Sequence, residues 1–171
     1  KLVSFDSTNA DWQYSLGLIY SNIGLIHMKS KEYTSAVNYF RLAIATLNPI
    51  VQKYPDNSAW NDSLNLSYFF LGDVQKEIGD ATSARQSYQS SAEILEKIGT
   101  ASSNFLSNRR RLAKIYYRLG LIDFENNHME EALKSFQKFI TVTEDLKNKY
   151  PEIDELDEML RVASKFVRKV Y

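Results

Sequence analysis

Three observations predict an all-α chain built from stacked helical hairpins. Glycines recur at Gly24, Gly72 and Gly120, each 48 positions after the one before. Apolar residues within a stretch are spaced by four and three positions, as on one face of a helix. Short segments rich in Gly, Asn, Ser and Lys separate these stretches. With 171 residues, 44% of them hydrophobic, the chain is long enough to bury a core between such helices.

The same period relates many other positions. Identical residues recur as Leu16, Leu64 and Leu112, as Tyr20, Tyr68 and Tyr116, and as Ala36, Ala84 and Ala132. Phe40, Tyr88 and Phe136 form a conservative set at the same offset. A unit of this length holds two helices of about 18 to 20 residues and two short turns. Each unit is therefore predicted to be a helical hairpin.

Turn signals set the order of the elements. The first unit spans residues 9–54 and turns at Lys29-Ser30-Lys31. Tyr54-Pro55-Asp56-Asn57 separates it from the second unit, and Asn57 is expected to cap the next helix.

The remaining elements follow the same pattern. The second unit, residues 57–99, turns at Ile78-Gly79-Asp80, and the third, residues 104–149, turns at Asn126-Asn127-His128. Residues 152–171 begin acidic and end basic, as the helix dipole favours, and are expected to form a capping helix.

The recurrent glycines predict close contact between the two helices of each hairpin. Glycine inside a helix costs about 0.5 to 1 kcal/mol relative to Ala, so it persists where a neighbouring helix must approach closely. We expect the small residues Ala36, Ala84 and Ala132 to form the opposing surface. A bulky residue in either set is expected to overpack the contact by about 1 to 3 kcal/mol.

The order of an apolar residue, Gly, Ala twelve positions later and an aromatic residue four beyond it resembles the tetratricopeptide repeat. The first copy reads Tyr20, Ile23-Gly24, Tyr33, Ala36, Phe40, Ala43. The usual period of that family is about 34 residues, so each unit here is longer. The long form, with Asn9 and Trp12 or Asn57 and Trp60 at its start, is similar to arrays in bacterial signalling ATPases and effectors.

The resemblance implies a right-handed superhelix, an α-solenoid of three helix-turn-helix repeats plus a C-terminal capping helix. It also implies a concave groove that binds a partner's peptide or helix. The family's groove positions fall here on Ser21, Leu25, Met28, Phe69, Asp73, Lys76, Lys114, Tyr117, Leu121 and Phe124. The alternative, equally open, is that the longer helices shift the groove and these residues pack between units.

One class of these repeats holds a C-terminal carboxylate in a clamp of five polar residues. Only Lys114 and Arg118 match that clamp, because Ser21, Leu25 and Phe70 occupy the other positions. The resemblance therefore implies at most a two-cation anchor for a carboxylate or phosphate.

No catalytic constellation is present in the sequence. Phosphate-binding loops, nucleophile elbows and paired metal-binding histidines are all missing, and there is no cysteine. His27 shares its repeat position with Gln75 and Asp123, so hydrogen-bonded polar groups are expected there rather than a proton-transfer or metal site. A catalytic helical domain would need turnover that depends on His27 or His128. We expect no enzyme activity, no cofactor and no metal.

Charge also limits the partners. The chain has 21 Lys plus Arg and 21 Asp plus Glu, so no net field attracts nucleic acid or a membrane surface. A local cluster consists of Arg109, Arg110, Arg111, Lys114 and Arg118. We expect it to be solvated and paired with acids of an adjacent unit; a nucleic-acid site is the lesser alternative. No apolar run approaches the ~20 residues of a membrane span.

These observations predict a protein-interaction scaffold that binds protein or peptide. The alternative is a regulatory or oligomerisation segment of a larger bacterial signalling enzyme, docking on its own neighbouring domain. Leu2 and Val3 fall one period before Ile50 and Val51, so we expect a fragment of a larger protein, with self-association through an open N-terminal repeat end. With no signal-peptide pattern, a cytoplasmic location is expected.

Overall fold

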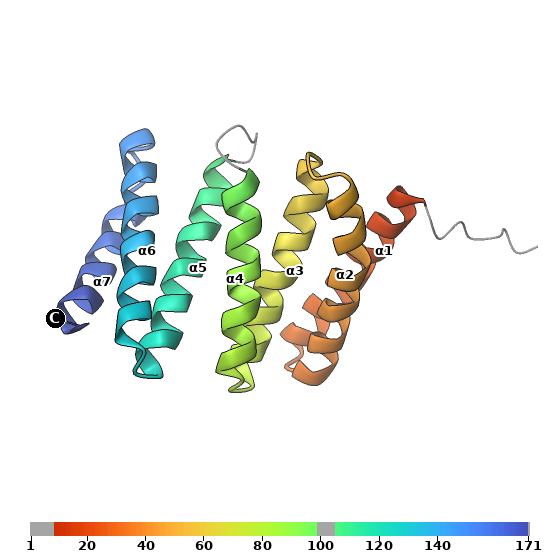
Figure 1. Ribbon diagram of the computed structural model, residues 1–171, viewed down its shortest axis with the longest axis horizontal. Coiled ribbons are helices and arrows are strands. Elements are labelled where there is room, and N and C mark those ends of the chain that lie inside the picture. The colour runs from red at the N-terminus through yellow and green to blue at the C-terminus, as the bar shows by residue number, and fades with distance from the viewer. Residues whose placement is uncertain (1–8, 99–104, 171) are drawn as a thin grey trace, which may run out of the picture. The chain divides into compact units, whose positions relative to one another are not determined.

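The computed structural model describes residues 9–98 and 105–170, and seven helices fill most of these two ranges (Figure 1). They are α1 (Ala10–Lys29), α2 (Tyr33–Lys53), α3 (Ser58–Glu77), α4 (Ala81–Ile98), α5 (Phe105–Glu125), α6 (Met129–Lys149) and α7 (Glu155–Val170). No strand occurs in the described ranges, so the predicted all-α class is confirmed. Leu2, Val3 and the expected boundaries at 99, 104 and 171 lie outside the described residues.

The helices pack as neighbours along the chain, as in an α-solenoid. Contacts divide the chain into two compact units, residues 1–91 and 92–171, with the division inside α4. In the first unit α1 packs on α2, and α2 packs on α3. In the second unit α5 packs on α6, and α6 packs on α7. Sequence-adjacent helices therefore bury one another's apolar faces.

The turn inside each hairpin has one repeated geometry. Lys31, Gly79 and Asn127, each 48 positions apart, have φ angles of 61°, 81° and 61°. The next residue's backbone N–H donates to a carbonyl five positions back, as from Glu32 to His27 (2.9 Å) and from Asp80 to Gln75 (2.9 Å). This left-handed helix ending with paired back-bonds is the Schellman motif. The three predicted turns are therefore one structure, repeated.

Helix starts are capped by side chains in the first unit. The Asn9 side chain accepts hydrogen bonds from the backbone N–H groups of Asp11 and Trp12. Asn57 accepts one from Trp60 (3.2 Å), which confirms its expected capping role. Such caps satisfy N–H groups that have no partner inside the helix.

The residues facing the recurrent glycines differ from the prediction. A methyl group added at Gly24, Gly72 or Gly120 would lie 2.9, 2.8 or 2.6 Å from a ring atom of Phe40, Tyr88 or Phe136, respectively. The atoms nearest to each glycine thus belong to these rings, which lie one turn beyond Ala36, Ala84 and Ala132. The alanines are fully buried on the same helices. A glycine is needed because a planar ring occupies the space of its missing side chain.

None of the helices in residues 9–98 and 105–170 combines the length and apolar character that a bilayer span requires.

Candidate functional site

The groove positions expected in α1 face the interior of the first unit. Leu25 and Met28 are half-buried and pack against a cluster that includes Val37 and Phe40 of α2. The Ser21 hydroxyl lies 2.7 Å from that of Ser67 on α3. These side chains connect helices of the same unit.

The expected positions in α3 behave similarly. Phe69 is buried, and its ring centroid lies 6.2 Å from that of Tyr88 on α4. Asp73 accepts a hydrogen bond from the Tyr88 hydroxyl at 2.6 Å. Lys76 is half-buried at the end of the same helix.

In the compact unit of residues 92–171, α7 contacts the expected groove positions of α5. The Phe166 ring lies 6.0 Å from Tyr117 and 5.9 Å from Phe124, and it stacks on Phe136 at 5.1 Å. Burial raises the pKa of the Tyr117 phenol above its ordinary value. Among the remaining expected positions of α5, Leu121 and Arg118 are half-buried and Lys114 is exposed. These contacts favour the packing alternative for the apolar groove positions.

An exposed apolar stripe, formed by Trp12, Ile19 and Ile26, follows the outer face of α1. Its members are seven positions apart and have exposed fractions of 40%, 54% and 63%. Spacing of seven places side chains on one face of a helix. No sequence argument singled out this stripe.

Equivalent positions in the other units are covered. Ser67 and Val74 of α3, which correspond to Ile19 and Ile26, have no exposed surface. Val74 belongs to the cluster that contains Val37 and Phe40 of α2. The same repeat position thus faces solvent in α1, as Ile26, and is buried against the preceding hairpin in α3, as Val74.

The histidines bond within their own hairpins. His27 Nδ1 lies 2.5 Å from Glu32 Oε2, and the His27 ring stacks on Tyr39 of α2 at 5.2 Å. At the equivalent position the Gln75 amide lies 2.6 Å from the Ser87 hydroxyl. These are the hydrogen-bonded polar groups that the repeat predicts. The described residues hold no group of three His, Asp or Glu side chains able to bind a metal.

The arginine cluster at the start of α5 is paired with acids. An Arg109 terminal nitrogen lies 2.8 Å from Asp145 of α6, and Arg110 bonds Glu155 of α7. The prediction placed the acids in an adjacent unit, which fits Arg110 and Glu155, whereas Arg109 pairs within its own hairpin.

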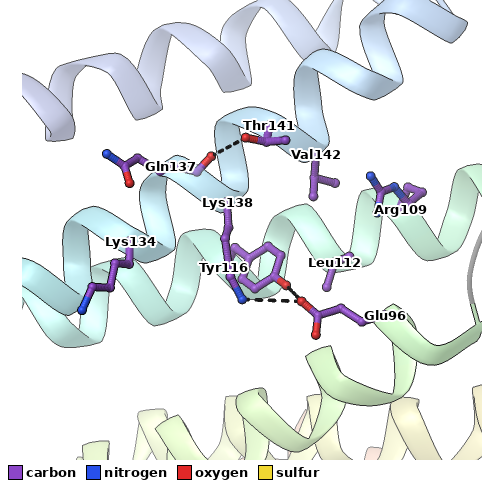
Figure 2. Close-up of a pocket in the computed structure, with 9 residues that line it drawn as sticks. All are labelled: Glu96, Arg109, Leu112, Tyr116, Lys134, Gln137, Lys138, Thr141 and Val142. Carbon is purple, nitrogen blue, oxygen red and sulfur yellow. Dashed lines mark hydrogen bonds and ion pairs between the residues drawn. The ribbon is translucent and has the colours of Figure 1, made fainter.

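A cavity of about 460 Å³ opens between α5 and α6 (Figure 2). Its floor consists of Leu112, Tyr116 and Val142, all buried. Its other lining residues are polar or charged: Glu96, Arg109, Lys134, Gln137, Lys138 and Thr141. The cavity thus combines an apolar floor with a rim that carries three cations and one carboxylate.

Glu96 sits at the centre of the polar contacts in this cavity. It accepts a hydrogen bond from the Tyr116 hydroxyl and lies 3.5 Å from Lys138 Nζ. That ammonium group lies 5.0 Å from the centroid of the Tyr116 ring. Burial, together with the hydrogen bond to Glu96, raises the pKa of the Tyr116 phenol. The site therefore already accommodates one carboxylate.

Sequence reasoning noted Arg109 but missed Glu96, Lys134 and Lys138. A signal exists in the repeat itself: the positions of Arg109, Lys134 and Lys138 carry no charge in the first two units. Arg109 corresponds to Gln13 and Asn61, Lys134 to Asn38 and Gln86, and Lys138 to Leu42 and Ser90. The cations are specific to the third unit, whereas Leu112 and Tyr116 belong to the shared scaffold.

A family model and two solved structures are similar to this chain or to parts of it. Residues 14–46 and 113–146 match the family model described as tetratricopeptide repeat. The crystal structure of BtubC (BKLC) from P. vanneervenii is similar over 98% of this chain, with 14% identity and a TM-score of 0.57; the chain spans 65% of that protein. The crystal structure of MamA protein is matched over 91% of this chain and 90% of MamA, with 18% identity and a TM-score of 0.33. No curated protein matches the sequence significantly.

Proposed function

Residues 14–46 and 113–146 match the tetratricopeptide repeat model, and from this likeness we propose a protein-interaction scaffold that binds a partner's helix along α1. Repeats of this family generally mediate protein–protein binding. The observation that carries the proposal is the exposed stripe of Trp12, Ile19 and Ile26. The α3 equivalents of Ile19 and Ile26, Ser67 and Val74, are buried against helices of the first hairpin, so a helix is the occupant whose shape fits.

The contact between α2 and α3 indicates the chemistry of that occupant. The face of α2 in this core presents Ala36, Val37 and Phe40, which are spaced as on one helix face. A partner helix with aliphatic and aromatic residues at such spacing would remove the stripe from water. Burial of apolar area contributes roughly 25 cal/mol per Å², which makes a stripe with a Trp and two Ile a plausible anchor.

A synthetic peptide with the sequence of residues 33–53, which forms α2, is a direct probe. In a Trp60→Phe background, Trp12 is the one remaining tryptophan, and its emission should shift to the blue when the peptide binds. Ile19→Lys and Ile26→Lys should each weaken binding at least ten-fold. Leu42→Lys is the matched control, because Leu42 is equally exposed but lies outside the stripe.

Unchanged Trp12 emission at millimolar peptide, or equal weakening by Leu42→Lys, would contradict the proposal. Light scattering on the chain alone tests the alternative role as an oligomerisation segment of a larger bacterial signalling enzyme. A dimer that Ile19→Lys dissociates would support self-association through α1 over capture of a separate partner.

The inner groove remains a second proposed surface. Exposed Lys114 and half-buried Arg118 lie one turn apart on α5 and could anchor a carboxylate or phosphate. Changing both to Ala should weaken an acidic ligand there, with less than about 0.5 kcal/mol change in stability per site. Unchanged binding would exclude the two-cation anchor.

A further inference from the structure

We propose that the cavity between α5 and α6 binds an extended acidic peptide segment, with an apolar side chain on its floor and carboxylates at its basic rim. The proposal rests on the scaffold role and assigns it a third surface. This surface consists of other residues than the α1 stripe and the inner groove positions.

The shape of the cavity favours an extended segment. Its α6 wall runs from Lys134 to Val142, and eight residues of helix rise about 12 Å. Extended chain advances about 3.3 Å per residue, so a wall of that length accommodates about four residues. Arg109 and Lys134 are drawn at opposite ends of the cavity in Figure 2. A ligand with acids at both ends and apolar residues between them matches this arrangement.

The charges at the rim are not required by the fold. The first two units carry neutral residues at the positions of Arg109, Lys134 and Lys138 and still form hairpins of the same kind. Arg109 and Lys138 pair with carboxylates of the chain itself, whereas Lys134 is exposed at the rim. Three cations beside a carboxylate release few counterions, which favours a short acidic peptide over a nucleic acid.

Arg109 is only partly satisfied by its ion pair with Asp145. Its terminal nitrogen donates to Asp145 at 2.8 Å. Its Nε is buried and has no hydrogen-bond partner among the described residues.

Glu96 already makes the contacts that a ligand carboxylate would make in this cavity. Its carboxylate accepts from the Tyr116 hydroxyl and pairs with Lys138, as a ligand carboxylate would. Because Glu96 occupies these donors, it competes with an incoming acid. Removing the charge of Glu96 should therefore strengthen binding of an acidic ligand.

The test is a calorimetric or NMR titration of the full chain with the capped peptide Ac-Glu-Leu-Leu-Glu-NH2. The matched probe Ac-Gln-Leu-Leu-Gln-NH2 has the same shape without charge. We expect the acidic peptide to bind at least ten-fold more tightly. Lys134→Gln and Lys138→Gln should each weaken it about two- to five-fold, and Glu96→Gln should strengthen it. Lys29→Gln, an exposed cation on α1, is the control and should have no effect.

Equal affinity for the two peptides, or equal weakening by Lys29→Gln and Lys134→Gln, would overturn the proposal. Lys134 is exposed, so its loss should leave the fold intact even where Arg109→Gln disturbs it. Ile19→Lys should leave this affinity unchanged. The proposal for the acidic-peptide site and the proposal for the α1 stripe can therefore be contradicted separately.

Discussion

The ring of Phe136 lies against Gly120 so closely that a methyl group at Gly120 would be 2.6 Å from a ring carbon. Gly120→Ala should therefore destabilise the chain by about 1 to 3 kcal/mol, because the ring must shift inside a close-packed core. Urea unfolding at constant slope measures the loss. Phe136→Leu should restore part of it in the double variant, whereas Ser107→Ala, exposed in the same helix, should cost little. Additive losses in the double variant would show that the ring is not the obstacle.

The shared turn geometry predicts opposite effects at two equivalent positions. Lys31 and Gly79 both have positive φ, a conformation that costs a side-chain residue about 1 kcal/mol. Lys31→Gly should raise the free energy of unfolding by about 0.5 to 1 kcal/mol, and Gly79→Lys should lower it by a similar amount. Thermal unfolding of the two variants measures both changes. Effects of the same sign would show that the turns are not equivalent in energy.

Asp80 gives the hairpin of α3 and α4 a pH dependence. Its carboxylate accepts from the Ser83 backbone N–H at 3.0 Å, and hydrogen bonds from Ser83 lower the pKa of Asp80. Because the pKa of Asp80 is lower in the folded chain than in the unfolded chain, its carboxylate stabilises the fold at pH values above the ordinary carboxyl pKa. This stabilisation is lost as pH falls through the folded-state value.

Asp80→Ala should therefore cost about 1 kcal/mol at pH 7 and progressively less below pH ~4. Denaturant unfolding across this pH range measures the difference. Asp80→Asn is the matched control, because an amide oxygen still caps the helix but does not titrate. A pH-independent loss in Asp80→Ala would argue against the cap as its cause.

The repeat unit was predictable because its signals are local. The spacing of apolar residues, the turn at Gly79 and the cap at Asn57 each depend on a few neighbouring residues. The partner of each glycine was not predictable in the same way. Ala132 and Phe136 lie one turn apart on the same helix face, so periodicity does not reveal that the Phe136 ring holds the atoms nearest to Gly120.

The candidate sites depend on contacts that periodicity does not contain. Tyr117 was expected in a groove, but it packs against Phe166, which is 49 positions away and on another helix. The cavity at Lys134 and Lys138 exists because side chains of α5 and α6 leave space between them, and a sequence pattern does not reveal a void. What the sequence did contain was the change from neutral residues to cations at these positions.

One repeat position should respond differently in α1 and α3. Ile26 is 63% exposed, whereas Val74, its equivalent, has no exposed surface. Ile26→Ser should therefore change stability by less than about 0.5 kcal/mol, since little apolar area leaves a buried environment. Val74→Ser should cost about 2 to 3 kcal/mol, because it leaves a cavity and buries a hydroxyl. Parallel denaturant titrations measure both, and similar losses would mean that Ile26 is covered in solution.

The peptide of residues 33–53 gives a second readout at the same position. It should raise the stability of the unaltered chain but not that of Ile26→Ser, because a ligand stabilises the folded chain only if it binds to it.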